Sequence, residues 1–264
     1  MHSVSWKDAI LLVAGKGERL GNLTKDIPKP LVQVSSVAIL ENAMAKLAEF
    51  GVERLHLVTG HHRELLMNFA QRHANGMKVF EIHNTVYDRT NNVYSLWLAR
   101  GVLSGGCLLL EGDVFFDGDV LQRLAAAPSE GSYWLADDFT ARNDGCALAT
   151  DVAGRINRLE IFRERRPADD RKWFKSLGIL AINATLGGNF SEWLNTAVEG
   201  SNNKIYYDLI LREHLEQASI QLLNVQGCRW VEIDDHDDLR HAERVFASER
   251  SNRRTEGKPR HAGD

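Results

Sequence analysis

The first 130 residues alternate short apolar runs with helical patterns, and this alternation constrains the fold more than any other feature. The runs are apolar on both faces, as in strands buried from both sides, whereas the first helical stretch repeats its apolar residues every three or four positions. Strands are predicted at residues 9–13, 55–59, 77–82 and 107–110, and helices at 37–50, 61–73 and 92–103. This pattern predicts a parallel sheet covered by helices, with ligands bound beyond the carboxyl ends of the strands.

From residue 132 onward the pattern changes to strands joined by turns. Strands are predicted at 132–136, 145–150, 155–162, 174–183, 220–225 and 230–233, and helices after 188, at 207–217 and at 237–248. No linker, repeat or low-complexity insert interrupts the chain, so we expect one domain over residues 1–249. Residues 250–264 are polar, and we expect them to form a disordered tail.

The composition excludes several other classes of protein. Hydrophobic residues make up 44% and charged residues 26%, which is typical of a globular protein, and a net charge of −4 disfavours a dedicated nucleic-acid binder. Three cysteines (Cys107, Cys146 and Cys228) are odd in number and widely spaced, unlike a disulfide framework or a zinc site. The apolar run 9–14 is too short to span a membrane. We therefore expect a cytoplasmic protein without nucleic-acid or membrane partners.

A glycine-rich stretch at residues 15–21 follows the first predicted strand. It lacks the ending of a P-loop and the third glycine of a dinucleotide fingerprint, so a plain turn would also explain it. Arg19 lies in this stretch, and Lys29 stands between Pro28 and Pro30, which fix the backbone on both sides. Two cations beside backbone N–H groups favour a phosphate site. Lys29 could also be a solvated lysine of a turn.

Two acidic segments follow predicted strands. Asp113 ends a Glu-Gly-Asp sequence after the run 107–110, where a strand-terminating turn is the alternative explanation. The second segment, residues 230–238, contains acids at 235–238 that could simply cap the last helix. Capping does not explain Asp234, which precedes them.

Three submotifs near the amino terminus together resemble the signature of the nucleotidyltransferases, enzymes that join a nucleoside triphosphate to a phosphorylated small molecule. They are Gly15-x-Gly17-x-Arg19, Leu23-Thr24 and Pro28-Lys29-x-Leu31, with Asn22 in place of the customary proline. The resemblance implies a Rossmann-like, mostly parallel sheet flanked by helices, of the glycosyltransferase-A-like kind, with a β-rich insertion on the acceptor side. It also implies that Arg19 and Lys29 are catalytic residues that neutralise the phosphates of the nucleotide.

The same resemblance extends to the acidic segments. Gly112-Asp113 is similar to the metal-binding motif of the family, and Asp234 to its second carboxylate, so both are implied ligands of Mg²⁺. Mg²⁺ prefers oxygen ligands and is usually held by one or two carboxylates together with substrate phosphates. The resemblance implies these nucleotide-binding residues: Val13, Ala14, Gly15, Gly17, Gly60, Asn91, Asn92, Ser95 and Glu111.

Residues 91–96, Asn-Asn-Val-Tyr-Ser-Leu, carry a narrower resemblance to bacterial phosphocholine cytidylyltransferases and their 2-aminoethylphosphonate relatives. Asn91 could also be the N-cap of the following helix. On this resemblance, Tyr206, Tyr207 and Asp208 are candidates for binding a cationic amine, because aromatic faces attract ammonium groups. Tyr207 could instead belong to the core, and Asp208 could be an acid at a helix N-terminus.

The segment between residues 132 and 190 departs most from this branch. Its basic residues are Arg142, Arg163, Arg165, Arg166, Arg171, Lys172 and Lys175. Most are expected to be solvated, but one or two could contact the phosphate of the acceptor, which leaves an anionic phosphonocarboxylate open as the acceptor.

The resemblance therefore implies Mg²⁺-dependent transfer of CMP from CTP to a small phosphate or phosphonate acceptor, such as phosphocholine or an aminoethylphosphonate, with release of pyrophosphate. A sugar-1-phosphate nucleotidylyltransferase is the alternative within the enzyme class. A catalytically silent nucleotide-binding module, or docking on an acidic partner through the basic tail, are alternatives outside it. The sequence leaves the oligomeric state open, a homodimer included.

Overall fold

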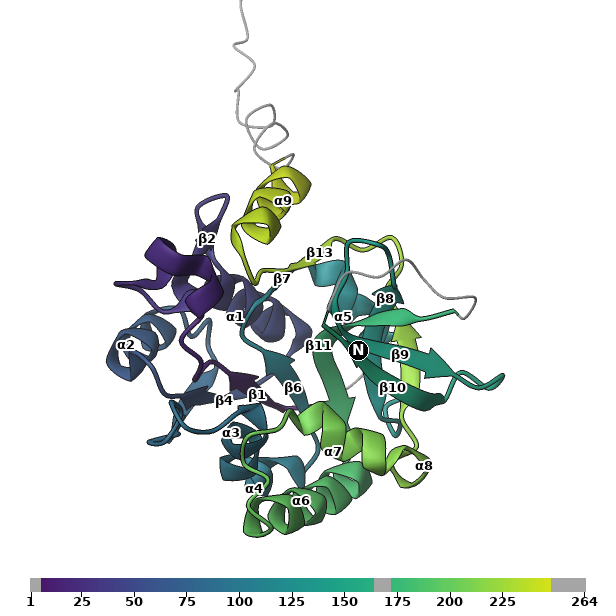
Figure 1. Cartoon of the computed structure of the whole chain (residues 1–264). Helices are drawn as coiled ribbons and strands as arrows, with labels where there is room; N and C mark the ends of the chain where they lie inside the picture. The colour runs from purple at the N-terminus through teal and green to yellow at the C-terminus, as the bar shows by residue number, and fades with distance from the viewer. Residues whose placement is uncertain (1–5, 164–171, 248–264) are drawn as a thin grey trace, which may run out of the picture.

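Nine strands of the described residues, 6–163 and 172–247 in this computed structural model, form one sheet (Figure 1). Four parallel strands lie side by side in the order β6-β1-β4-β5. They are β1 (Asp8–Leu12), β4 (Arg54–Thr59), β5 (Lys78–His83) and β6 (Cys107–Glu111). The predicted parallel arrangement of these four strands is confirmed.

Beyond β6 the sheet continues with antiparallel strands. The strand next to β6 is β11 (Phe174–Ile182), which also pairs with β8 (Tyr133–Asp138) and β9 (Gly145–Thr150). At the margins, β10 (Ile156–Phe162) pairs with β9, and β12 (Gln221–Asn224) runs parallel to β8. Each strand predicted between residues 132 and 225 is observed to within two residues, so the predicted α/β class with a β-rich second half is confirmed.

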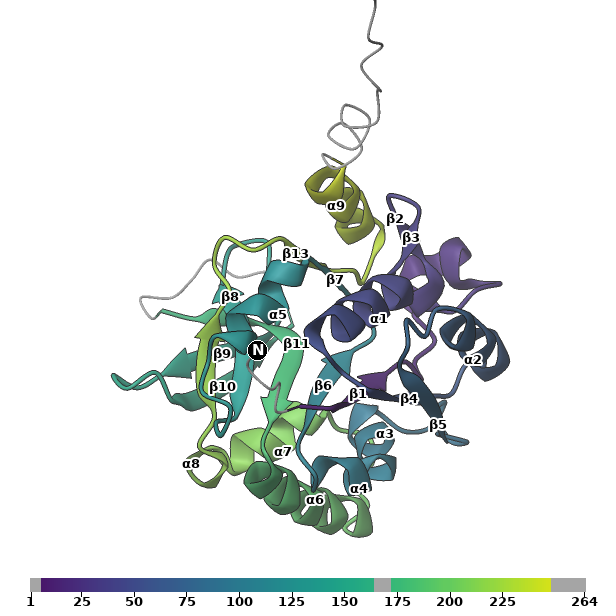
Figure 2. The ribbon, with the colours of Figure 1, turned by 180° about the vertical axis from the view of Figure 1, so that it is seen from behind.

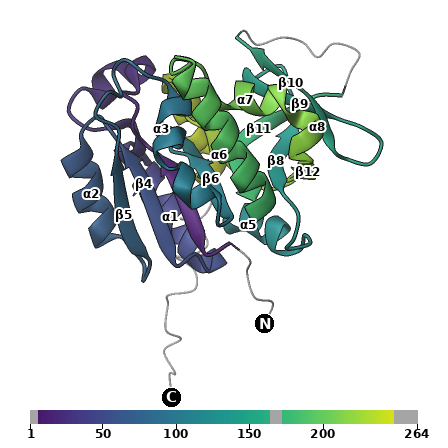
Figure 3. The same cartoon turned by 90° about the horizontal axis from the view of Figure 1, so that it is seen from below.

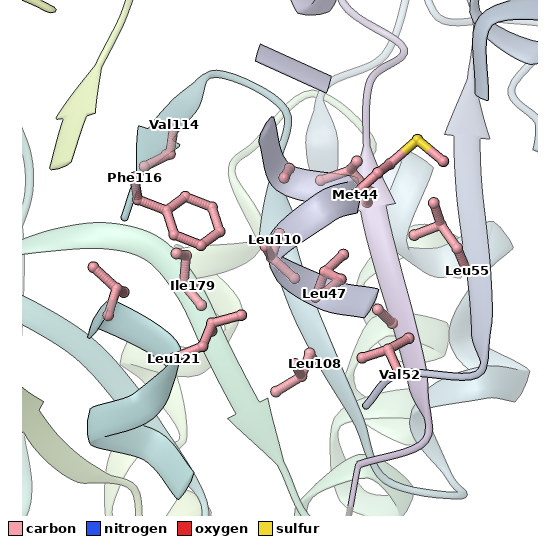
Figure 4. Close-up of a cluster of buried hydrophobic side chains, with 14 of the residues drawn as sticks. Met44, Leu47, Val52, Leu55, Leu108, Leu110, Val114, Phe116, Leu121 and Ile179 are labelled. Carbon is pink, nitrogen blue, oxygen red and sulfur yellow. The ribbon is translucent and has the colours of Figure 1, made fainter. Parts of the chain in front are cut away.

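Helices cover both faces of the sheet. One face carries α1 (Ile39–Phe50), α2 (Arg63–Arg72) and α5 (Gly118–Ala125), which Figure 2 shows from behind. The other carries α3 (Asn92–Leu98), α4 (Arg100–Leu103), α6 (Ala184–Glu199), α7 (Tyr207–Glu213) and α8 (Leu215–Ala218), with α3, α4 and α6 lying together in Figure 3. Alternate residues of β1 divide accordingly, with Leu11 in the first core and Ile10 in the second. In the first core, Leu110 lies beside Leu47, and Ile179 lies beside Phe116 (Figure 4).

Several helices differ from the predicted ranges. The predicted helix 92–103 breaks at Ala99 into α3 and α4, and the helix 207–217 breaks at His214 into α7 and α8. The helix expected after residue 188 begins earlier, at Ala184, because the side chain of Asn183 accepts a hydrogen bond from Leu186 N and caps it. The pattern did not predict α5.

A third, smaller core joins the glycine-rich segment to the C-terminal helix. Its elements are two 3₁₀ helices, η1 (Glu18–Thr24) and η2 (Lys29–Leu31), the hairpin of β2 (Gln33–Val34) and β3 (Val37–Ala38), the pair of β7 (Val114–Phe116) and β13 (Trp230–Glu232), and α9 (His236–Phe246). Leu20, Phe115, Ile233 and Phe246 are buried together there. This core brings the segment after β1 next to the segment after β13.

Some predictions fall outside the described residues. These are Arg165, Arg166, Arg171, the predicted helix end at Ser248 and the tail 250–264. Among the residues that are described, no helix combines the length and the apolar character that crossing a membrane requires.

Candidate active site

A cleft opens at the carboxyl ends of β1 and β6, the position expected for a ligand site in a parallel sheet. One cavity of about 610 Å³ is joined to a second of about 570 Å³, and both are lined by Gly15, Arg19, Asp113 and Asp234. The cleft runs from the glycine-rich segment to the antiparallel strands. We call the part around residues 15–19 and Lys29 the loop end, and the part facing β9 and β11 the strand end.

Lys29 reaches into the loop end because the backbone around it leaves room. Gly17 adopts a φ of +67°, and a Cβ added there would lie 2.6 Å from Cβ of Lys29. The hydroxyl of Thr24 donates a hydrogen bond of 2.9 Å to the Gly17 carbonyl and closes the segment. Pro28, in extended conformation, and the buried Pro30 flank the lysine. Glycine and prolines together direct the side chain.

The Lys29 ammonium bridges two carboxylates. Its Nζ lies 2.9 Å from Asp113 Oδ2 and 2.7 Å from Asp234 Oδ1, and Arg19 lies 2.8 Å from the same Asp234 oxygen. The side chain of Lys29 is 13% exposed, whereas that of Arg19 is 65% exposed. Burial opposes the charge on Lys29, but the two carboxylates outweigh it and raise the lysine pKa. Burial likewise opposes ionisation of Asp234, but Lys29 and Arg19 hold its pKa below the ordinary value.

The backbone fixes both of these carboxylates. Gly112 packs against β1 so closely that a Cβ would lie 2.6 Å from a carbonyl oxygen of that strand. Ile233 N donates to the carbonyl of Asp113 at 2.9 Å, which ties the turn after β6 to the segment after β13. The carboxylate of Asp238 accepts from Asp234 N at 3.0 Å. The structure therefore brings the four predicted catalytic and metal-binding residues together, although Lys29 and Asp234 are 205 positions apart.

The predicted nucleotide-binding residues, apart from Gly60, line the cleft. Those that line the two cavities are Val13, Ala14, Gly15, Gly17, Asn91, Asn92, Ser95 and Glu111. Gly60 lies behind this wall, where a Cβ would come within 2.7 Å of the Ala14 carbonyl oxygen. Gly60 therefore permits close packing of the wall and does not itself line either cavity.

The asparagines are held by hydrogen bonds. Asn91 is the N-cap of α3, as the alternative explanation held, since its side chain accepts from Asn92 N at 2.7 Å. The side-chain Oδ1 of Asn92 accepts a hydrogen bond from Tyr207 N at 2.9 Å, and its side-chain Nδ2 donates to a carboxylate oxygen of Glu111 at 3.5 Å. Asn92 thus connects the start of α3 to α7 and to the end of β6.

The three predicted acceptor-binding residues lie in different environments. Tyr206 is 43% exposed and lines the cleft, and Asp208 is 6% exposed and also lines it. Tyr207 is completely buried in the core beside Phe190, as the alternative explanation held, and its hydroxyl lies near the carboxyl group of Glu111. The structure brings Tyr206 and Asp208 to the cleft and directs Tyr207 into the core.

Sequence reasoning missed an ion pair at the strand end. Lys175 of β11 has a side chain that is only 4% exposed, and its Nζ lies 2.7 Å from a carboxylate oxygen of Glu232. Gly145, with a φ of +82°, leaves room for this ammonium, because a Cβ there would lie 3.1 Å from it. A lysine in the otherwise apolar run 174–182 was the signal that could have found it. Cys146 completes this wall.

The strand end holds more carboxylates than its neighbouring lysine can balance. Burial raises the pKa of Glu111 well above its ordinary value, and the negative charges of Asp208 and Asp113 raise it further. Burial raises the pKa of Asp208 to about 6, although its backbone hydrogen bond, the Cys146 thiol and Lys175 oppose the change. Burial also raises the pKa of Glu232 to about 7 against the effect of Lys175. This wall therefore favours a cation.

The other basic residues of this region lie apart from these carboxylates. Arg163 is exposed and lines the main cavity, and Arg142 lines a smaller adjoining cavity of about 210 Å³. Lys172 is exposed and lies 3.8 Å from a carboxylate oxygen of Asp138. Of the described basic residues between 142 and 175, Lys175 is the buried one.

The carboxylates at the centre of the cleft fit a hard divalent cation. Asp113 Oδ1 is buried and has no hydrogen-bond partner among the described residues. One carboxylate oxygen from each of Glu111, Asp113 and Glu232 lies within 4.8 Å of the others. An oxygen-only donor set of this kind suits Mg²⁺, which binds through carboxylates and retains water ligands.

The fold and this arrangement of cations and carboxylates define a nucleotide-transferring enzyme. The chain belongs to the family described as the MobA-like NTP transferase domain, whose model matches residues 9–177. The predicted nucleotidyltransferase family is confirmed.

Among individual proteins, the chain is similar to cytidylyltransferases and to a related CMP-phosphonate synthase. The chain is 32% identical over 252 residues to CMP-5′-(3-aminopropyl)phosphonate synthase of Streptomyces rubellomurinus, covering 93% of this chain and 40% of that protein. It is 25% identical over 235 residues to 2-aminoethylphosphonate cytidylyltransferase of Lancefieldella rimae, covering 88% and 90%. Among solved structures, CTP:phosphocholine cytidylyltransferase from Streptococcus pneumoniae superposes with a TM-score of 0.75 at 21% identity, covering 90% of this chain and 98% of that one. The predicted resemblance to this branch is confirmed.

Proposed function

We propose that this chain transfers CMP from CTP to a small phosphonate or phosphate acceptor that carries a primary ammonium group, and releases pyrophosphate. The similarity to two phosphonate cytidylyltransferases supports the nucleotide and the acceptor class. This chain spans less than half of the Streptomyces protein, so the proposal concerns the transferase step alone. We further propose that residues 1–249 form one catalytic domain and that the tail is dispensable for turnover.

The observation that carries the proposal is the position of Lys29 and Arg19 beside Asp113 and Asp234 at one end of a cleft whose other end holds buried carboxylates. Cations at the loop end suit the triphosphate of a nucleotide. Carboxylates at the strand end suit a cationic acceptor. A cleft with cations at one end and carboxyl groups at the other fits a reaction between a polyanionic nucleotide and a phosphonate that carries an amine.

In the proposed mechanism, the acceptor needs no general base, because a phosphonate oxygen is already an anion at neutral pH. This oxygen forms a bond to the α-phosphorus of CTP, the bond from that phosphorus to the bridging oxygen of the β-phosphate breaks, and pyrophosphate carries away the electron pair. Lys29 and Arg19 neutralise the charge on the phosphates, and the buried walls exclude water. Asp113 and Asp234 would hold Mg²⁺, which supplies further neutralisation of phosphate charge when bound.

Lys175 is suited to contact the acceptor. Its ammonium lies on the wall opposite the glycine-rich segment and remains charged, because Glu232 outweighs the effect of burial and raises its pKa. A phosphonate group near this ammonium would lie between it and the nucleotide. The amine at the other end of the acceptor would then contact Asp208 and Glu111.

The charge at the strand end favours a primary ammonium over the other acceptors considered. Three cleft-lining carboxyl groups (Glu111, Asp208 and Glu232) have raised pKa values, so a cation on the acceptor would stabilise their ionised forms, whereas an additional carboxylate would oppose ionisation. A primary ammonium donates three hydrogen bonds to such a wall, whereas a quaternary ammonium donates none and depends on aromatic faces. This argument disfavours a phosphonocarboxylate.

The test is pyrophosphate release with Mg²⁺ and each nucleoside triphosphate against a panel of acceptors. We expect CTP with aminopropylphosphonate, aminoethylphosphonate or phosphoethanolamine to exceed CTP with phosphocholine by at least ~10-fold, the value of one charge-assisted hydrogen bond. Propylphosphonate, which lacks the amine, is the matched control. UTP or dTTP with a sugar phosphate as the best pair would contradict the proposal, and no release with any pair would favour a silent nucleotide-binding module.

A further inference from the structure

The ammonium of Lys29 occupies the position between Asp113 and Asp234. Its Nζ lies within 2.9 Å of both carboxylates, a contact that a metal ion bridging the pair would also make. The three side chains are between 13% and 21% exposed, so solvent screens this contact only weakly. The two carboxylates therefore already have a cation before any ligand binds.

The positive charges already beside Asp113 and Asp234 oppose the binding of a further cation there. Lys29 contacts both carboxylates, and Arg19 lies 2.8 Å from the same Asp234 oxygen that Lys29 contacts. A divalent ion placed between Asp113 and Asp234 would stand next to two positive groups at short range, where charge interactions are strong. It can enter only if Lys29 moves away.

The nucleotide offers Lys29 another partner. The prolines on either side fix the backbone of Lys29, but its four-carbon side chain can turn toward the phosphates at the loop end. A triphosphate brings about four negative charges, enough to engage Lys29, Arg19 and a metal ion together. Asp113 Oδ1, which has no hydrogen-bond partner among the described residues, is then available as well.

We infer that Lys29 acts as an internal cation that keeps the Asp113–Asp234 pair closed to divalent metal until nucleotide phosphates draw the lysine away. Metal and nucleotide then bind together, and metal alone does not bind at this pair. The inference rests on the proposed nucleotide site, but its test requires no turnover.

The test is a titration of the full chain with Mn²⁺, in which the electron paramagnetic resonance signal of the free ion measures how much Mn²⁺ is bound. We expect no Mn²⁺ bound at the Asp113–Asp234 pair of the wild type at sub-millimolar concentrations without nucleotide, and tight ternary binding when non-cleavable α,β-methylene CTP is added. Lys29→Met should bind Mn²⁺ without nucleotide at least ~10-fold more tightly than the wild type, because one close positive charge is gone. Lys46→Met is the control: Lys46 lies on α1, 3.0 Å from a carboxylate oxygen of Glu49 and outside the cleft lining, and its replacement should leave Mn²⁺ binding unchanged.

A folded Lys29→Met variant with wild-type Mn²⁺ affinity overturns the inference. So does a nucleotide-free wild type that binds Mn²⁺ tightly and loses this binding in Asp234→Asn, a variant that keeps the carboxylates of Glu111, Asp113 and Glu232. If Lys29→Met does not fold, thermal melting decides: Mn²⁺ alone should shift the melting temperatures of the wild type and Asp234→Asn equally, and a larger shift in the wild type overturns the inference. If no acceptor supports turnover but the Mn²⁺ results are as expected, the proposed function is contradicted and the inference about Lys29 stands.

Discussion

Replacing Asp208 by asparagine should make the protein more stable and a poorer enzyme. Asp208 lies in the first turn of α7, is 6% exposed, and faces the strand end of the cleft. Burial raises its pKa from 3.8 to about 6, so its charge is unfavourable in the folded, ligand-free protein. Asparagine has nearly the same shape and keeps an oxygen that can accept the local backbone hydrogen bond.

The size of the stability gain follows from the pKa. Each pH unit by which a carboxyl pKa rises on folding is equivalent to about 1.4 kcal/mol, so a rise from 3.8 to about 6 corresponds to about 3 kcal/mol. Between these pH values the folded wild type binds more protons than the unfolded chain, so its stability falls as the pH rises. Below pH ~4 the aspartate is protonated in both states and the variant gains nothing from this effect. Losing the acid at a helix N-terminus subtracts about 0.3–1 kcal/mol.

The assay has two parts. Urea unfolding of wild type and Asp208→Asn at several pH values between 4 and 8 should show a stability difference that grows from near zero to about 2–3 kcal/mol and levels off above pH ~6. Under the proposed function, kcat/KM for aminopropylphosphonate should fall by about 10–100-fold in the variant, the cost of losing a hydrogen bond to a charged group. With propylphosphonate, which has no amine, the variant should match the wild type.

Parallel stability profiles for the two proteins would refute the reasoning about burial. An equal loss of kcat/KM for acceptors with and without the amine would refute the assignment of Asp208 to the ammonium group. Asp119→Asn is the matched control, because Asp119 also lies in the first turn of a helix but is exposed. It should leave the acceptor preference unchanged, and it measures the cost of removing an acid from the first turn of a helix.

Three further predictions concern the loop end. Lys29→Ala and Asp113→Ala should each lower pyrophosphate release by at least ~10²-fold, the scale of losing one preorganised charge contact; near-wild-type release from either folded variant would remove that residue from the mechanism. Gly17→Ala should lower turnover by about 10-fold more than Gly76→Ala. Both glycines have positive φ, but a Cβ at Gly17 would displace Lys29, whereas a Cβ at Gly76 would meet no atom within 4 Å; equal turnover in the two variants would contradict this. Phe246→Ala should cost about 3 kcal/mol in urea unfolding and raise the CTP concentration needed for half-maximal rate, since this ring lies 4.8 Å from Phe115 in the core beside Asp234; unchanged CTP dependence would show that this core does not position the carboxylate.

The parallel half of the sheet could be predicted from the sequence because local pattern and environment agree there. Residues 9–13 are apolar on both faces, and both faces of β1 are in fact covered by helices. The position of Asp113 followed from the same rule, since it comes directly after a buried strand. The local sequence pattern was therefore enough to predict those features that depend on a single strand or helix.

The parts that could not be predicted depend on contacts between distant segments. The pairing of β7 with β13 carries Asp234 to Lys29, and no local signal specifies that pairing. Lys175 was grouped with mostly solvated basic residues because its spacing does not reveal the cavity that residues of β9 and β11 line. Helix breaks at Ala99 and His214 were missed because the apolar repeat continues through both.

Apart from Glu111 and Glu232, which stand two residues before Asp113 and Asp234, the two ends of the cleft are built by different parts of the chain, and this has a consequence for specificity. The small core around Leu20, Phe115 and Phe246 holds the glycine-rich segment, Lys29 and Asp234 in one unit, so the nucleotide end can be kept while other parts change. The strand end depends on β9, β11 and α7, which pack in the second core. Substitutions at Asp208 or Cys146 can therefore alter the electrostatics that an acceptor meets without moving the cations that meet the triphosphate. Since the carboxylates at the strand end destabilise the ligand-free fold, their charge is explained best by a cationic group that enters the cleft with the acceptor.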